Sequence, residues 1–127
     1  MSLSAESDGK LPELNARIRL QLGEDIALGP GKVELLELIE ETGSISAAAR
    51  RMGMSYRRAW LLVETMNRCF ASPLVETAQG GKGGGGAGVS EMGQQVLSLY
   101  HQLEEKLQVS EEMQQISQFV AQDIHLD

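Results

Sequence analysis

The chain has 127 residues, of which 42% are hydrophobic and 23% charged, a composition that fits one globular domain rather than two domains or a disordered chain. Its formal net charge is −7 and its one cysteine is Cys69, which excludes an intramolecular disulfide framework and a cysteine-based zinc site. No apolar run approaches the roughly 20 residues that span a bilayer, and the first residues lack a secretory signal pattern, so we expect a cytoplasmic protein with no membrane partner.

The N-terminal part predicts a lead-in followed by a small hairpin. Residues 1–13 are polar, small and acidic, which predicts a disordered lead-in. Residues 15–22 alternate between apolar and polar side chains, which predicts a half-buried strand. The apolar positions of this alternation are Ile18, Leu20 and Leu22. A turn at residues 23–25 and a short return strand at residues 26–28 complete the hairpin.

Three helices are predicted next, and the last two form a helix-turn-helix. A proline near the first helical position and a glycine at the far end predict a helix over residues 30–42. Ser44 is the candidate N-cap of a short helix over about residues 46–52. Ser55 is the candidate N-cap of a longer helix over about residues 56–70. The tight turn between the second and third helices is typical of a helix-turn-helix.

A glycine-rich segment flanked by short strands follows the helix-turn-helix. Residues 74–77 and Val89 are the strand candidates, and seven of the nine residues 80–88 are glycine. A helix-turn-helix followed by such a hairpin indicates a winged helix, with Lys82 near the tip of the wing. A nucleotide-binding loop is disfavoured because Lys82 is followed by Gly83 instead of serine or threonine, and no βαβ unit surrounds it.

The C-terminal part predicts a long helix that begins after Ser90 and joins two copies of the chain. A helix this long cannot bury its whole apolar stripe against so small a domain, so we expect a homodimer. The predicted interface residues are Met92, Val96, Leu99, Tyr100, Leu103 and Leu107. Ser110 either continues this helix or caps a new one. We therefore divide the chain into a winged helix-turn-helix domain at residues 14–90 and a dimerisation helix with a tail at residues 91–127.

The charge distribution indicates an anionic partner for the central segment. Residues 44–82 carry a balance of +4, whereas residues 1–43 and 83–127 carry −5 and −6. Arg57 and Arg58 begin the second helix of the helix-turn-helix, where arginine side chains can pair with guanine in the major groove. Double-stranded DNA is therefore the predicted partner.

No catalytic or metal site is predicted, and we expect no cofactor. The sequence offers no acid–base pair and no nucleophile–base set. His101 and His125 have no partners at metal-ligand spacing.

Three segments resemble one family of regulators. The segments GSISAAAR (43–50), SYRRAW (55–60) and GGKGGGGA (80–87) occur in the order and spacing of the N-terminal domain of ModE. ModE proteins are molybdate-responsive bacterial transcription regulators, and this domain is a LysR-type winged helix-turn-helix. The resemblance implies a mainly α fold with a small β component and a DNA-binding homodimer. The DNA-binding positions that we assign are Ser46, Arg50, Arg51, Ser55, Tyr56, Arg57, Arg58, Gly81, Lys82 and Gly83.

The chain departs from this family mainly in length. About 20 residues follow the resemblance, too few for the C-terminal molybdate-binding domains of full-length ModE, so we expect no sensing domain here and a possible separate effector-sensing protein as partner. The acidic flanks also favour an alternative. In that alternative, the winged helix is a protein-interaction module that no longer binds DNA.

Overall fold

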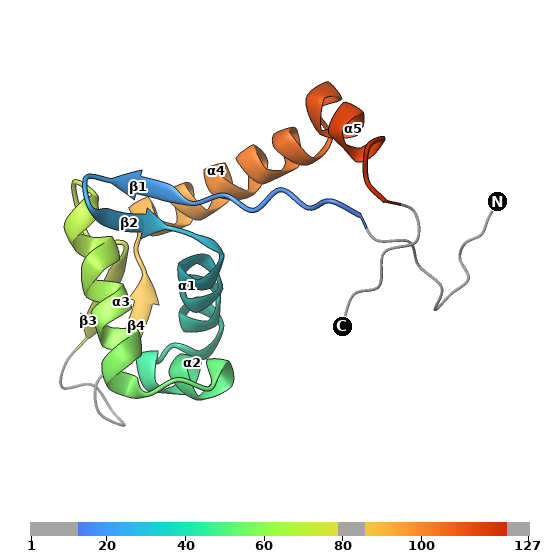
Figure 1. Ribbon diagram of the computed structural model, residues 1–127. Helices are drawn as coiled ribbons and strands as arrows, with labels where there is room; N and C mark the ends of the chain where they lie inside the picture. The colour runs from blue at the N-terminus through green and yellow to red at the C-terminus, as the bar shows by residue number, and fades with distance from the viewer. Residues whose placement is uncertain (1–12, 79–85, 122–127) are drawn as a thin grey trace. The chain divides into compact units, whose positions relative to one another are not determined.

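The computed structural model describes residues 13–78 and 86–121. The chain divides into two compact units, one of residues 17–102 and one of residues 1–16 together with 103–127. The larger unit is mainly helical with two small two-stranded sheets (Figure 1), which confirms the expected fold class. We call this unit the winged-helix unit.

The first hairpin is shorter and more exposed than the sequence predicts. Strand β1 (Leu20–Leu22) pairs in antiparallel fashion with β2 (Asp25–Leu28), and Gly23 forms the turn with a φ of +61°. The expected half-buried strand over residues 15–22 is too long, because the strand covers only Leu20–Leu22 and all three of these residues are exposed. Of the predicted apolar positions, only Ile18 packs partly against the core. The strand of this hairpin that enters the core is β2, which supplies the buried residue Leu28 and packs against α3.

Helices α1 (Pro30–Thr42) and α2 (Ile45–Met52) have the predicted ends. Pro30 occupies the first turn of α1, where its missing N–H costs no helical hydrogen bond. Gly43 ends α1 with a φ of +73°, a left-handed conformation that glycine adopts without steric cost. Ser44 caps α2, because its Oγ accepts a hydrogen bond from the amide of Ala47 at 3.0 Å.

Helix α3 (Tyr56–Cys69) carries the central apolar face of the unit. Ser55 caps it by accepting a hydrogen bond from the amide of Arg58 at 3.1 Å. Its side chains at helical spacing enter the core that α1, α2 and β2 also line. The largest fully buried side chains of this core are Leu28, Leu35, Leu36, Ile39, Val63, Met66 and Leu74.

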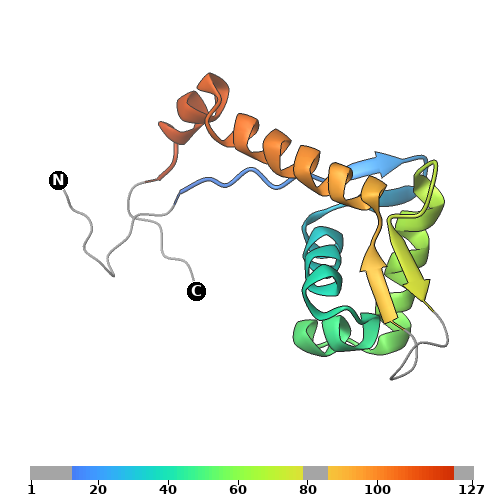
Figure 2. The same ribbon diagram turned by 180° about the vertical axis from the view of Figure 1, so that it is seen from behind.

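The second hairpin lies beside α1 and α3 (Figure 2). Strands β3 (Val75–Ala78) and β4 (Gly86–Val89) pair in antiparallel fashion over four residues each. The amide of Ala87 donates a hydrogen bond to the carbonyl of Gly43 at 3.0 Å. This bond ties the hairpin to the turn between α1 and α2. We call the hairpin of β3 and β4 the wing.

Helix α4 (Glu91–Gln108) leaves the wing through a tight junction. As predicted, Ser90 caps it: its Oγ accepts from the amide of Gly93 at 3.0 Å and donates to the carbonyl of Pro73 at 2.7 Å. Within the winged-helix unit, the Tyr100 hydroxyl donates to the carbonyl of Ile18 at 2.6 Å. The middle of α4 is thereby fixed to the segment that precedes β1.

The smaller unit is described at residues 13–16 and 103–121. The Gln108 side chain accepts a hydrogen bond from the amide of Ala16 at 2.7 Å and donates to the carbonyl of Leu14 at 2.9 Å. Ser110 caps a new helix, α5 (Glu111–Ser117), and does not continue α4. Of the two alternatives at Ser110, the structure therefore takes the second.

Candidate nucleic-acid interface

Helix α3 presents one face to the core and the opposite face to solvent. Ala59, Val63 and Met66 are fully buried, whereas Arg57 and Leu61 are exposed. On a helix with 3.6 residues per turn, Tyr56 and Trp60 lie on one flank of the exposed face, and Arg58 and Leu62 lie on the other. A hollow adjoins each flank, and the two hollows differ in chemistry.

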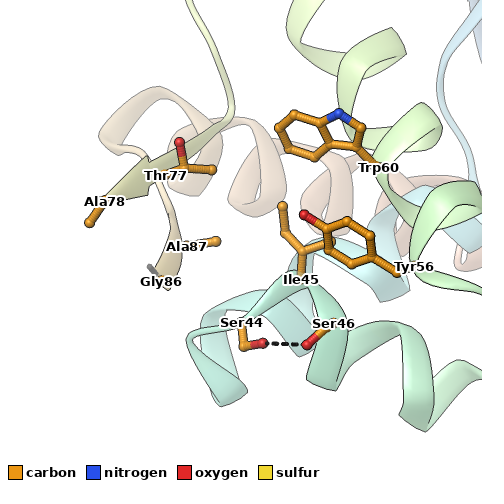
Figure 3. Close-up of a pocket in the computed structure, with 9 residues that line it drawn as sticks. All are labelled: Ser44, Ile45, Ser46, Tyr56, Trp60, Thr77, Ala78, Gly86 and Ala87. Atoms are coloured by element: carbon orange, nitrogen blue, oxygen red, sulfur yellow. Dashed lines mark hydrogen bonds between the residues drawn. The ribbon is translucent and has the colours of Figure 1, made fainter. Parts of the chain in front are cut away.

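The first hollow, which we call the wing-side hollow, lies between α2, α3 and the wing (Figure 3). It has a volume of about 410 Å³. Its lining residues are Ser44, Ile45, Ser46, Tyr56, Trp60, Thr77, Ala78, Gly86 and Ala87. Among the described residues that line this hollow, α2, α3 and the wing each contribute hydroxyl side chains and none contributes a charged one, so this lining offers hydrogen bonds.

The start of α2 forms the floor of the wing-side hollow. The Oγ atoms of Ser44 and Ser46 lie 3.3 Å apart, as the dashed line in Figure 3 marks. Across from them, Figure 3 shows Thr77 and Ala87 on the wing and the aromatic rings of Tyr56 and Trp60 on α3. Tyr56 is half exposed and Trp60 is partly buried against the core.

The second hollow, which we call the α1-side hollow, has a volume of about 290 Å³ and lies on the flank of Arg58. Its lining residues are Arg19, Ile26, Gly29, Pro30, Gly31, Lys32, Met54, Arg58 and Leu62. Burial lowers the pKa of Lys32 below its usual value of 10.5, and the charges of Arg19 and Arg58 lower it further. Cys69 and Asp25 act in the opposite direction. Three cations thus gather around this hollow.

Asn67 on α3 fixes the wing to the helix, and sequence reasoning missed it. Its Oδ1 accepts hydrogen bonds from the amides of Leu74 at 2.8 Å and Val75 at 3.1 Å. Its Nδ2 donates to the carbonyl of Val75 at 3.1 Å. The feature of the sequence that could have identified Asn67 is a polar residue of low helix propensity beside the apolar stripe of α3.

The predicted DNA-binding residues divide between the described part of the chain and the rest. Ser46 and Tyr56 line the wing-side hollow, and Ser55 is occupied as the cap of α3. Arg50 and Arg51 lie exposed in the last turn of α2, where Arg51 pairs with Glu41 at 3.1 Å. Arg57 and Arg58 lie exposed in the first turn of α3. Gly81, Lys82 and Gly83 lie outside the described residues.

The predicted dimer residues have unequal exposure. Tyr100 is buried in its own chain, and Met92 and Val96 pack partly against the core. Leu99, Leu103 and Leu107 recur every fourth residue of α4 and expose 63%, 40% and 42% of their surface. The exposed part of the predicted stripe is therefore these three leucines.

The described residues include no cluster of three or more histidine, cysteine, aspartate or glutamate side chains that could hold a metal ion. In the same part of the chain, no helix combines the length and apolar character that a membrane crossing requires.

Comparison with known proteins finds relatives over about two thirds of the chain. The chain is 47% identical over 77 residues to the molybdenum-pterin-binding protein MopB of Rhodobacter capsulatus, and the matched region covers 61% of this chain and 28% of MopB. The chain is 41% identical over 83 residues to the DNA-binding transcriptional dual regulator ModE of Escherichia coli K12, and this match covers 65% of the chain and 32% of the relative. The transcriptional regulator ModE of Yersinia pestis matches with the same identity and coverage. No protein-family model matches the chain.

The chain spans about a third of the length of the curated relatives that it matches. These relatives carry the names of regulators, a molybdenum transport protein and molybdenum-pterin-binding proteins, and none carries the name of an enzyme.

Proposed function

We propose that the chain is a ModE-like, sequence-specific DNA-binding protein that regulates transcription as a homodimer. The observation that carries this proposal is the arrangement around α3, whose exposed face begins with Arg57 and is bordered by the wing. The N-terminal turn of such a helix reads base edges in the major groove, and arginine pairs bidentately with guanine. The similarity to regulators named ModE supports the same function.

The roles of the individual residues follow from their positions. Arg57 projects from the exposed first turn of α3 and reads a base edge. Ser46 and Tyr56, at the wing-side hollow, donate hydroxyl hydrogen bonds to the DNA backbone, a kind of contact that fixes register without reading sequence. Arg50 and Arg51 add positive charge at the end of α2. Lys82, with Gly81 and Gly83 on either side, adds a positive charge between β3 and β4 in the sequence.

The homodimer forms through Leu99, Leu103 and Leu107 of α4. Three large apolar side chains at a spacing of four residues form one exposed row on a helix, and a second copy of the same row buries it. A two-fold dimer presents two copies of α3 to DNA. The half-sites that it reads then lie about one helical turn, roughly 34 Å, or a multiple of it apart.

The test is to select DNA fragments with the purified protein. Sheared DNA from the source organism is incubated with the protein at low and at physiological salt, and the retained fragments are sequenced. We expect a small set of fragments that share a two-fold-symmetric sequence. Trp60, the only tryptophan of the chain, lines the wing-side hollow, so its fluorescence should change when the recovered duplex is added.

Two outcomes contradict the proposal. Retention of no fragment at low salt means that the domain does not bind DNA, and the protein-interaction module becomes the better interpretation. Retention of unrelated fragments with equal affinity means that the binding is not sequence-specific.

A further inference from the structure

The two flanks of α3 face the two walls of the groove that the helix is proposed to enter. The major groove is about 12 Å wide, and an α-helix with its side chains is 10–12 Å across. A helix inside the groove therefore runs between two phosphodiester strands, with one strand along each flank. In this chain the hydroxyl-lined wing-side hollow adjoins one flank and the cation-lined α1-side hollow adjoins the other.

The α1-side hollow collects its charge from three separate elements. Arg19 comes from the segment before β1, Lys32 from the first turn of α1 and Arg58 from α3. Like charges that line one hollow repel each other, and an anion between them relieves that repulsion. The neighbouring carboxylate, Asp25, lies 3.5 Å from Arg68, which already partners it.

The shape of the hollow also suits an anion that arrives from outside. Of the three cations that line it, Arg19 and Arg58 are exposed and Lys32 is partly buried. A phosphate group is small relative to the volume of about 290 Å³. Such a group can approach the two arginines and the lysine together.

We propose that the α1-side hollow binds a phosphate of the DNA backbone, held by Arg19, Lys32 and Arg58, on the strand opposite the wing. This inference rests on the proposed DNA-binding function and changes the role of Arg58. Arg57 reads a base, whereas its neighbour Arg58 positions the protein on the backbone. Arg19 and Lys32, which lie outside the helix-turn-helix, become part of the DNA footprint.

The test compares single charge-removing variants on two duplexes. Affinities of Arg19→Gln, Lys32→Gln and Arg58→Gln are measured over a range of salt concentrations. One duplex is recovered in the selection above, and the other is an unrelated duplex of equal length. We expect each variant to bind both duplexes about threefold to tenfold more weakly, and the slope of log K against log salt to become shallower by about 0.9.

Two matched controls isolate the hollow. Lys106→Gln removes an exposed cation of α4 that does not line the hollow, and it should leave affinity and slope unchanged. Lys32→Arg keeps the charge and should retain most of the affinity. Circular dichroism of each variant verifies that it is folded before binding is compared.

Several results would overturn the proposal while leaving DNA binding intact. One is a wild-type affinity and slope for both Arg19→Gln and Lys32→Gln. Another is a loss confined to the recovered duplex, which would make these residues readers of base sequence. A separate NMR experiment titrates the protein with inorganic phosphate and follows the amide signals of Gly31 and Lys32. Saturation at micromolar phosphate would overturn the proposal, because it would assign the hollow to a free anion.

Failure of wild-type protein to bind either duplex would overturn both this inference and the proposed function. Failure of this inference alone is distinguishable from failure of the proposed function, because only the latter abolishes DNA binding by the wild-type protein.

Discussion

The side chain of Asn67 pairs with both backbone polar groups of Val75. Its Oδ1 accepts from the Val75 amide and its Nδ2 donates to the Val75 carbonyl, each at 3.1 Å. One amide side chain on α3 thus replaces a neighbouring strand for the first residue of the wing. This side chain and the bond from Ala87 to Gly43 are two polar interactions that hold the wing, in addition to the packing of Val75 and Val89 on the core.

Replacement of Asn67 by alanine should destabilise the protein by about 1–3 kcal/mol, because it leaves partly buried backbone groups of Leu74 and Val75 without partners. Asn67→Asp keeps the acceptor but loses the donor, and it should cost less. Urea denaturation measures both. Thr65→Ala on the same helix is the control and should stay within about 0.5 kcal/mol of the wild type. Equal stability of Asn67→Ala and Thr65→Ala would show that the hydrogen bonds of Asn67 to Leu74 and Val75 do not stabilise the fold.

Gly93 is required by the junction between the wing and α4. A Cβ atom at this position would lie 2.5 Å from the carbonyl oxygen of Leu74 and 2.6 Å from Cγ1 of Val89. Gly93→Ala should therefore destabilise the protein by about 1–3 kcal/mol. Gly31→Ala is the matched control, since a Cβ there meets nothing within 4 Å. In α1 it should be stabilising by about 0.5–1 kcal/mol, and thermal unfolding of both variants decides the comparison.

Arg57 should determine sequence preference. Under the proposed function, Arg57→Ala loses about 1–3 kcal/mol of binding to the recovered duplex and relaxes the preference at one base position. Competition binding against a set of duplexes with single base changes measures this. Arg58→Ala, in contrast, should weaken all of these duplexes to the same extent. A uniform loss for Arg57→Ala would reverse the roles of the two arginines.

The row of leucines on α4 should hold the dimer together. Leu103→Asp places a charge in the proposed apolar interface, so sedimentation at micromolar concentration should report a monomer where the wild type is a dimer. Gln102→Asp, which adds the same charge at the adjacent exposed residue, should leave the dimer intact. A monomeric wild type would rule out this interface.

Lys32 should lower the stability of the protein in the absence of DNA. Its pKa is lowered in the folded state, chiefly by burial, so at neutral pH the folded chain carries an unfavourably placed charge. The cost is fully present at low pH and is relieved as the pH rises through the lowered pKa toward 10.5. Lys32→Met should therefore raise the free energy of unfolding at pH 7 slightly, by at most about 0.5 kcal/mol, because solvent screens a side chain that is only partly buried. The difference between variant and wild type should shrink at alkaline pH.

The predictions from sequence succeeded where the signal is local. Ser44, Ser55 and Ser90 cap the helices that they were predicted to cap, and glycines at positions 43 and 53 end helices in the left-handed conformation. These features depend on residues within one helical turn of each other. The expected burial of β1 failed because an alternating pattern does not reveal whether other elements cover the strand. In this fold the core covers part of β2 and leaves β1 exposed.

The sequence by itself determined the boundaries of α1, α2 and α3 and the central positive charge, because each is fixed by residue type at short spacing. It left open whether Ser110 continues α4 or caps a new helix. Only the tertiary structure brought Arg19, Lys32 and Arg58 to one hollow, directed Asn67 to the wing and buried Tyr100 in its own chain. These relationships join residues between 8 and 82 positions apart. The packing of β2, α1 and α3 around one core decides such distances, and no local pattern encodes that packing.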